Sequence, residues 1–347
     1  MKYTLTDANF PRTSDQRVYH LGLRPGEVAN RIITVGSPSR ANAIAAFLDT
    51  NPKPFVLTSE RGFLTITGRY KGVPISIISI GMGSPNMDFF VREARECLSG
   101  DMLIVRLGSC GALVDVPVGS VVVPKASVAI SRNVDYDFHN TAVNRDPPYR
   151  ISKPVSADVA LHLEVCKALR ESRPPGSDAT ILPGTVNASA DSFYSSQGRQ
   201  TSFPDQNADL IAQLQASTPD LATLEMETFH LYHLAACWGG GNSPSAKSAD
   251  PPLATGPVKP VASLSKSPAS SATSPRLASP DSVIRAAAAQ MIFASRTSQG
   301  FITPDQVTEV ERWTGLGVLN ALINMEIPAD RLHSETASVW ETISESV

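Results

Sequence analysis

The sequence predicts an α/β sandwich built around a largely parallel or mixed sheet. Short runs rich in β-branched residues, typical of buried strands, alternate with longer runs typical of helices. Strand 31–35 precedes helix 41–48, and strand 75–80 precedes helix 87–98 and strand 102–107. Such alternation is the pattern of α/β folds. The chain has 347 residues, of which 42% are hydrophobic, so it can bury the core that this fold needs.

Composition excludes several classes of function. A net charge of -3 gives no basic surface for nucleic acid, and no run of about 18 apolar residues predicts a membrane span. Four cysteines lie far apart without a CxxC pair, which argues against a zinc site and a disulfide framework. The first twenty residues contain no apolar targeting segment. We therefore expect a cytoplasmic protein whose partners are small molecules.

The N-terminal third contains two candidate anion sites, the first at residues 36–40 and the second at Arg106. Residues 1–19 are polar and predict a surface arm. Strand 31–35 ends at Gly36, and Pro38 then begins a helix whose free amides could receive an anion. Arg40 lies in the first turn of that helix, where a cation opposes the helix dipole and needs a negative companion, unless it is simply exposed. Arg61 comes at the start of a predicted hairpin (64–70) and is, on its own, typical of a solvated charge.

Arg106 is the one charge in the buried strand 102–107, and a small-residue turn is predicted directly after it at 108–111. A desolvated guanidinium requires an anion, and the glycines would let backbone amides reach the same anion. Arg106 is therefore either half of a phosphate site or the partner of a nearby carboxylate. The glycine turn at 81–86 does not predict a dinucleotide site, because the following strand ends in Arg106 rather than in an acid.

The middle of the chain contains further polar groups. A strand at 120–124 precedes a Pro-rich loop in which Asp135, Asp137 and His139 indicate a solvated surface more than a metal site. After a helix (156–171) and a strand (184–190), a loop contains Phe193, Gln197 and Arg199. An amide and a planar guanidinium can match the edge of an imide-like ring, and Phe193 can stack on it. An ordinary surface loop is the alternative.

Two acids, Glu225 and Glu227, flank Met226 before a predicted helix at 229–238. On an extended segment they would share a face, and a carboxylate can accept both hydrogen bonds of a vicinal diol such as ribose. The alternative is that the acids merely suit a helix N-terminus. Residues 239–282 are rich in Ser, Pro and Ala and predict a disordered insertion, with an interdomain linker as the other interpretation. Helix 304–324 follows, and 328–347 form a tail.

Seven segments together resemble the nucleoside phosphorylase family, and most closely its uridine-cleaving members. They are His20, VGSPSR (35–40), Arg61, GMGSP (81–85), VRLGSCGA (105–112), ADSFYSSQGR (190–199) and LEMET (224–228). The resemblance implies one domain over 20–327, with a three-layer α-β-α sandwich around a central mixed twisted sheet of the phosphorylase/hydrolase-like kind. It implies no cofactor and no metal, with inorganic phosphate as co-substrate, and a homodimer or larger assembly.

The resemblance also implies roles for individual residues. Gly36, Arg40, Arg106 and Ser109 would bind phosphate, with Arg61 reaching in from a neighbouring subunit. Met226, Glu227 and Ser109 would hold the ribose, and the neighbour's His20 would reach its 5′-hydroxyl. Phe193 would stack near the base, while Gln197 and Arg199 would recognise the uracil edge. Arg106, Glu227 and Arg296 would be the catalytic residues.

Arg296 favours a pyrimidine over a purine as the base of the nucleoside substrate. Purine-cleaving members typically carry Ser-Asp where this chain has Ser295-Arg296 in the segment 289–299. An arginine is not a general acid at neutral pH, but it can offset charge on a departing pyrimidine. The expected reaction is phosphorolysis of uridine to uracil and ribose 1-phosphate. A purine nucleoside phosphorylase, a hydrolase of the same fold and a non-catalytic nucleoside-binding protein are the alternatives.

Five positions depart from the family pattern. Val35 and Ser37 stand in a turn that is usually Pro-Gly-Asp-Pro, Asn86 replaces a serine, and Cys110 replaces a threonine or serine. Gly62 stands where bacterial uridine-cleaving members carry a glutamate that helps bind potassium. A potassium site is therefore not predicted here.

Overall fold

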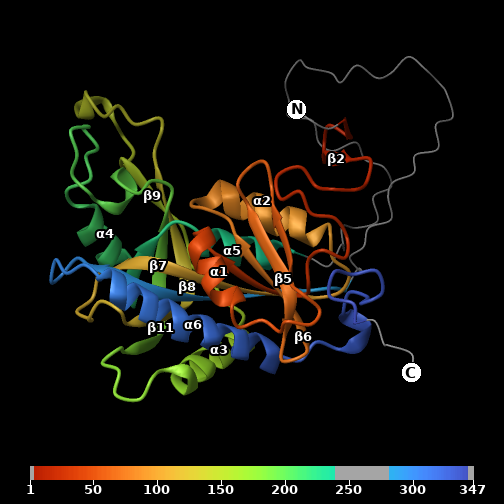
Figure 1. The fold of residues 1–347 in the computed structure, drawn as a ribbon. Helices are drawn as coiled ribbons and strands as arrows, with labels where there is room; N and C mark the ends of the chain where they lie inside the picture. Colours follow the sequence, from red (N-terminus) through yellow and green to blue (C-terminus); the bar gives the residue numbers. More distant parts are fainter. Residues whose placement is uncertain (1–3, 239–280, 343–347) are drawn as a thin grey trace, which may run out of the picture.

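A mixed sheet of eleven strands forms the centre of the computed structural model, which describes residues 4–238 and 281–342 (Figure 1). The main path of the sheet runs β10-β8-β11-β12-β7-β3-β6-β5-β4. Strand β13 pairs with both β7 and β8, and β9 pairs with β8. Parallel pairs such as β3 with β7 and antiparallel pairs such as β12 with β7 occur in the same sheet, as predicted.

The strands are β1 (Leu5–Thr6), β2 (Arg12–Thr13), β3 (Arg31–Val35), β4 (Phe55–Thr58), β5 (Leu64–Tyr70), β6 (Val73–Ser79), β7 (Met102–Ala112), β8 (Val121–Arg132), β9 (Tyr149–Ile151), β10 (Val155–Ser156), β11 (Ile181–Ala190), β12 (Leu221–Glu225) and β13 (Ile284–Ser295). The α-helices are α1 (Pro38–Ala45), α2 (Ser84–Arg95), α3 (Val159–Ser172), α4 (Leu210–Ser217), α5 (Thr228–Cys237) and α6 (Pro304–Asn324). Short 3₁₀ turns lie at Thr141–Val143, Ser195–Gln197 and Ala329–Arg331.

Helices cover both faces of the sheet and give the expected three layers. Helices α1, α3 and α6 pack against one face over a core that includes Ile33, Ile44 and Leu319. Helices α2 and α5 cover the other face over a core that includes Ile32 and Phe90. In Figure 1, α2 lies above the sheet while α3 and α6 lie below it. Among the described residues, no helix is both long and apolar enough to cross a bilayer.

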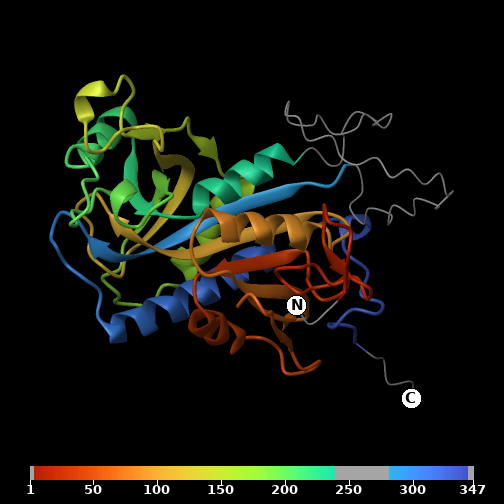
Figure 2. The ribbon, with the colours of Figure 1, turned by 90° about the horizontal axis from the view of Figure 1, so that it is seen from above.

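One half of the sheet closes on itself. Strand β13 joins β7 to β8, β8 pairs with β11, β11 with β12, and β12 returns to β7. Figure 2 shows β13 as the long light-blue strand that crosses the middle of the molecule. This closure brings the C-terminal ends of β7, β12 and β13 together, which is where an α/β sheet commonly binds its ligand.

The predicted turn at 108–111 is wrong, because β7 continues through it to Ala112. Gly108 instead leaves room for the buried side chain of Gln290. A Cβ atom there would lie 2.3 Å from Oε1 of Gln290 on β13. Strand β8 likewise extends well beyond the predicted 120–124, and α4 was not predicted.

Both ends of the described chain are more ordered than the sequence predicts. The N-terminal arm contains the hairpin β1–β2, and Val18 at its end is buried. The tail residue Trp340 is also buried, and Arg69 pairs with Glu335. Of the predicted disordered insertion (239–282), residues 239–280 lie outside the described residues. Its last residue, Ser282, is buried and accepts a hydrogen bond from the Trp238 indole.

Candidate active site

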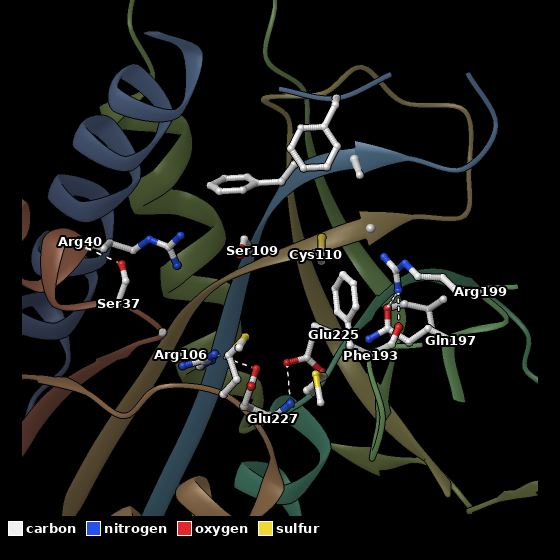
Figure 3. A pocket seen from close by; sticks show the side chains of 18 residues that line it. Ser37, Arg40, Arg106, Ser109, Cys110, Phe193, Gln197, Arg199, Glu225 and Glu227 are labelled. Carbon is white, nitrogen blue, oxygen red and sulfur yellow. Dashed lines mark hydrogen bonds and ion pairs between the residues drawn. The ribbon is translucent and has the colours of Figure 1, made fainter. Parts of the chain in front are cut away.

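A cavity of about 320 Å³ opens where β3, β7, β12 and β13 end (Figure 3). It contains nine of the twelve residues that the sequence analysis assigns to a site. These are Gly36, Arg40, Arg106, Ser109, Phe193, Gln197, Arg199, Met226 and Glu227. They come from four separate segments of the chain, and the fold brings them to one place.

Arg106 and Glu227 form the buried centre of the pocket. The Arg106 Nη2 donates to Glu227 Oε2 at 2.7 Å, and both side chains are about 95% buried. Glu227 Oε1 accepts the backbone N–H of Gly83 at 2.5 Å. Arg106 Nε and Nη1 are buried and have no hydrogen-bond partner among the described residues. Arg106 therefore pairs with a carboxylate and still has two donors for a further acceptor.

Arg40 forms the outer wall of one side of the pocket, which also contains Gly36, Arg106 and Ser109 and is called the anion side below. Its Nε donates to Glu311 Oε1 of α6 at 2.7 Å, and its Nη1 lies 3.3 Å from the Leu107 carbonyl oxygen. Burial lowers the pKa of Arg40, while the Glu311 carboxylate opposes that shift. The negative companion that Arg40 needs is thus Glu311, which no local sequence signal identifies.

Small residues let the backbone come close to the two guanidinium groups. A Cβ atom on Gly36 would lie 3.8 Å from Arg106 Nη2. Ser37 is the N-cap of α1 and accepts the backbone N–H of Arg40 at 3.3 Å. Ser109 lines the same wall from β7. Hydroxyls, a helix N-terminus and two cations around one cavity make an anion site.

Glu225 supports the turn that carries Met226 and Glu227. Its Oε1 accepts from Asn187 Nδ2 at 2.7 Å and from the Ser189 hydroxyl, and its Oε2 accepts the backbone N–H groups of Glu227 and Thr228 at 2.9 Å each. Burial and the adjacent Glu227 raise the pKa of Glu225. The two acids therefore have different partners, although both line the pocket from the turn between the end of β12 at Glu225 and the start of α5 after Glu227.

One short loop, residues 193–199, forms the opposite side of the pocket. Arg199 Nη1 donates to Gln197 Oε1 at 2.5 Å and to the Phe193 carbonyl oxygen at 2.7 Å, and its guanidinium lies 3.8 Å from the Phe193 ring centroid. Burial, followed by the nearby charge of Arg296, lowers the pKa of Arg199 to about 10. Gln197 is buried and its amide N–H₂ makes no hydrogen bond within the described residues. An aromatic face, an amide and a guanidinium are thus held together.

Arg296 does not line the pocket itself but lies directly behind this loop. Its Nη2 donates to the Gln197 carbonyl oxygen at 2.6 Å. Burial lowers its pKa. In this structure Arg296 holds the backbone of Gln197 in place.

His20 and Arg61 lie on another surface of the same chain. His20 Nδ1 lies 2.6 Å from a Glu93 carboxylate oxygen, and its ring stacks on Phe89. Arg61 hydrogen-bonds to the Tyr19 hydroxyl, and Tyr19 also contacts the His20 ring. The two residues thus share a patch away from the pocket. Their predicted role, in the pocket of a neighbouring subunit, remains a prediction.

Several residues in and around the pocket were missed. Phe293 and Phe301 give it an apolar wall, and Met82 lies at the rim.

In the loop that was weighed as a metal site, Asp137 instead accepts the backbone N–H groups of His139 and Asn140, which lowers the pKa of Asp137. Across residues 4–238 and 281–342, no group of three or more His, Cys, Asp or Glu side chains is arranged to hold a metal ion.

Comparison with known proteins identifies the class. Residues 30–239 match the family model of the Phosphorylase superfamily, and the chain belongs to this superfamily. The resemblance drawn from the sequence motifs is thereby confirmed. The relatives are nucleoside phosphorylases, which are pentosyltransferases, and the protein is an enzyme of this kind.

Three relatives show how far the similarity extends. A uridine phosphorylase of Thermococcus kodakarensis is 31% identical over 236 residues, which cover 67% of this chain and 76% of the relative. A DeoD-type purine nucleoside phosphorylase of Oceanobacillus iheyensis is 30% identical over 63% of this chain and 81% of the relative. A solved structure from a study of two uridine phosphorylases in the oomycete Phytophthora capsici has a TM-score of 0.76 and 35% identity, and covers 93% of this chain and all of that chain.

Proposed function

We propose that the protein catalyses the reversible phosphorolysis of uridine to uracil and α-D-ribose 1-phosphate, in the cytoplasm, as a step of pyrimidine salvage. The observation that carries the proposal is the buried Arg106–Glu227 pair. Among the residues that the structure describes, two donors of Arg106 have no partner and could bind a phosphate, and Arg106 touches the carboxylate that would hold the ribose. Nucleophile and sugar would thus be bound side by side, in the arrangement that phosphorolysis needs.

The anion side of the pocket would bind and orient the phosphate. Arg40, Arg106, the Ser109 hydroxyl and the backbone at Gly36 surround the space in which it would lie. Met226 and Glu227 would hold the ribose, with Glu227 accepting from its hydroxyls. A phosphate oxygen forms the new bond to C1′ while the C1′–N1 bond breaks, and its electron pair leaves with the uracil. No cofactor takes part in this scheme.

The loop at 193–199 would select the base. Phe193 supplies a face for stacking, and the Gln197 amide with the Arg199 guanidinium matches the imide edge of uracil. As the bond to C1′ lengthens, negative charge grows on the base, and two nearby guanidinium groups, Arg199 and Arg296, would stabilise it. A protonated purine would gain nothing from these cations.

A purine nucleoside is the second candidate substrate, because DeoD-type purine nucleoside phosphorylases are also about 30% identical to this chain. A hydrolase is disfavoured by the two cations of the anion side, which have no role in water attack. A non-catalytic nucleoside-binding protein would use the same pocket without turnover.

We further propose that the pocket is completed in a homodimer or larger assembly. His20 and Arg61 lie together on one surface, and both would enter the pocket of a neighbouring subunit, at the ribose 5′-hydroxyl and the phosphate. Analytical ultracentrifugation tests the assembly. A monomer under assay conditions would contradict the shared site.

One assay separates these possibilities. The ultraviolet change on base release is followed with uridine or inosine, each with and without inorganic phosphate. We expect phosphate-dependent release of uracil and little release of hypoxanthine. A preference for inosine would establish the purine activity, release without phosphate would establish a hydrolase, and no release from either would leave only binding.

A further inference from the structure

Arg40 depends on one side chain from the far end of the chain. It is 5% exposed and lies in the first turn of α1, which contains no acidic residue to balance it. A cation at this end of a helix is unfavourable, and burial and the nearby Arg106 both lower the pKa of Arg40. Glu311 of α6, 271 positions away, is the carboxylate that contacts it.

Two of the three guanidinium nitrogens of Arg40 have hydrogen-bond partners in the protein. Nε is held by Glu311 at 2.7 Å, and Nη1 lies 3.3 Å from the Leu107 carbonyl oxygen. Within the part of the chain that the structure describes, Nη2 makes no hydrogen bond. Figure 3 shows the end of the guanidinium pointing into the pocket toward Ser109.

The crossing of α1 and α6 fixes the distance between the two charges. A Cβ atom on Gly315 of α6 would lie 2.9 Å from Cγ1 of Ile44 on α1, so the two helices approach closely because residue 315 is a glycine. Arg40 precedes Ile44 by four residues, and Glu311 precedes Gly315 by four. Residues four apart share a helix face, so the crossing places Arg40 opposite Glu311.

We propose that Glu311 is a positioning residue for phosphate. By holding Nε and balancing the buried charge, it keeps the remaining donor of Arg40 directed into the pocket. The proposal rests on the proposed function, since it assumes that phosphate is the anion bound there. Glu311 touches no substrate in this scheme, and it acts only through Arg40.

Binding of inorganic phosphate to the full chain, measured by isothermal titration calorimetry, tests this role. We expect Glu311→Ala to weaken phosphate binding about 10-fold, and Glu311→Gln, which keeps an acceptor, about 3-fold. Glu309→Ala is the matched control, because Glu309 is exposed on the same helix, and it should bind phosphate like the wild type. In steady-state kinetics KM for phosphate should rise in Glu311→Ala, while KM for the nucleoside should stay within about twofold.

A double-mutant cycle shows whether the effect passes through Arg40. Once Arg40→Ala has weakened binding, adding Glu311→Ala should cause no further loss. A further loss, or equal or tighter phosphate binding by Glu311→Ala alone, would overturn the role of Glu311. A wild-type protein that binds no phosphate would overturn the proposed function and this inference with it. Thermal unfolding of each variant shows that the folded protein is being compared.

Discussion

The two sides of the pocket are built differently. On the anion side, Arg106 and Glu227 are 121 positions apart in the chain, Arg40 and Glu311 are 271 apart, and all four lie in or beside core strands and helices. On the base side, Phe193, Gln197 and Arg199 contact one another within a single loop, and Phe193 is 46% exposed. A buried network of distant residues is hard to change one residue at a time, whereas a half-exposed loop tolerates substitution.

This difference suggests how one fold serves several nucleosides. In the proposed scheme the reaction with phosphate depends on the anion side, so relatives acting on different bases could keep that side. The choice of base would depend on the loop and on Arg296 behind it. Substitutions on the two sides should therefore have separable effects on phosphate and on base.

The largest effect is expected on the anion side. Arg106→Ala removes two donors for phosphate and leaves Glu227 buried without its charged partner. We expect kcat/KM to fall about 1,000-fold or more and the free energy of unfolding to fall by about 3–5 kcal/mol. Enzyme assays and urea unfolding measure the two effects. Near-normal activity in the folded variant would refute the anion site.

Glu227→Gln should have the next largest effect. The amide can still accept a hydrogen bond but no longer balances Arg106 or binds the ribose hydroxyls as an anion. We expect kcat/KM to fall about 100-fold. The Glu309→Asp variant, which changes an exposed residue, serves as a control. If Glu227 holds the ribose hydroxyls, the loss on this substitution should be much smaller with 2′,3′-dideoxyuridine, which lacks them, than with uridine; an equal loss with both would contradict that role.

On the base side, Arg199→Ala should lower uridine turnover about 10-fold or more through loss of the charge near the departing base. Binding of inorganic phosphate should not change, because Arg199 belongs to the other side of the pocket. Calorimetry with phosphate and the ultraviolet assay with uridine separate the two. Uridine turnover within a few-fold of the wild type would show that Arg199 does not recognise the base.

The smallest effect is a pH dependence of stability at Glu225. Its pKa in the folded protein is raised above its ordinary value of about 4.5. Its contribution to stability is therefore greatest below the unfolded pKa and declines as pH rises through the folded pKa. Glu225→Gln does not titrate, so the stability of the wild type should fall relative to that of the variant as pH rises from about 4.5. Urea unfolding across this range measures the difference, and an opposite slope would show that the folded pKa is lowered.

Local patterns predicted the elements better than the contacts between them. Strands 31–35 and 64–70 and helix 304–324 have the predicted bounds, because burial and periodicity are written in neighbouring residues. The turn at 108–111 was wrong because the glycine at 108 leaves room for the Gln290 side chain instead of making a turn. The structure shows the carboxylate partner that was one interpretation of Arg106, and within the described parts of the chain two donors of Arg106 have no partner, so the other interpretation, a phosphate site, stays open.

Most of the candidate site could be predicted from its motifs, but its supporting contacts could not. Glu311 is an ordinary acid on an amphipathic helix, and only the crossing of α1 and α6 brings it to Arg40. The amide of Gly83, which binds Glu227, likewise depends on how α2 begins beside α5. Pairings over more than a hundred positions leave no local signal in one sequence.

The most direct test is to follow the phosphorus by ³¹P NMR while the wild-type protein acts on uridine. The account predicts that the inorganic phosphate signal declines and a sugar 1-phosphate signal grows by the same amount as uracil appears. Uracil formed while the phosphate signal stays constant would contradict it.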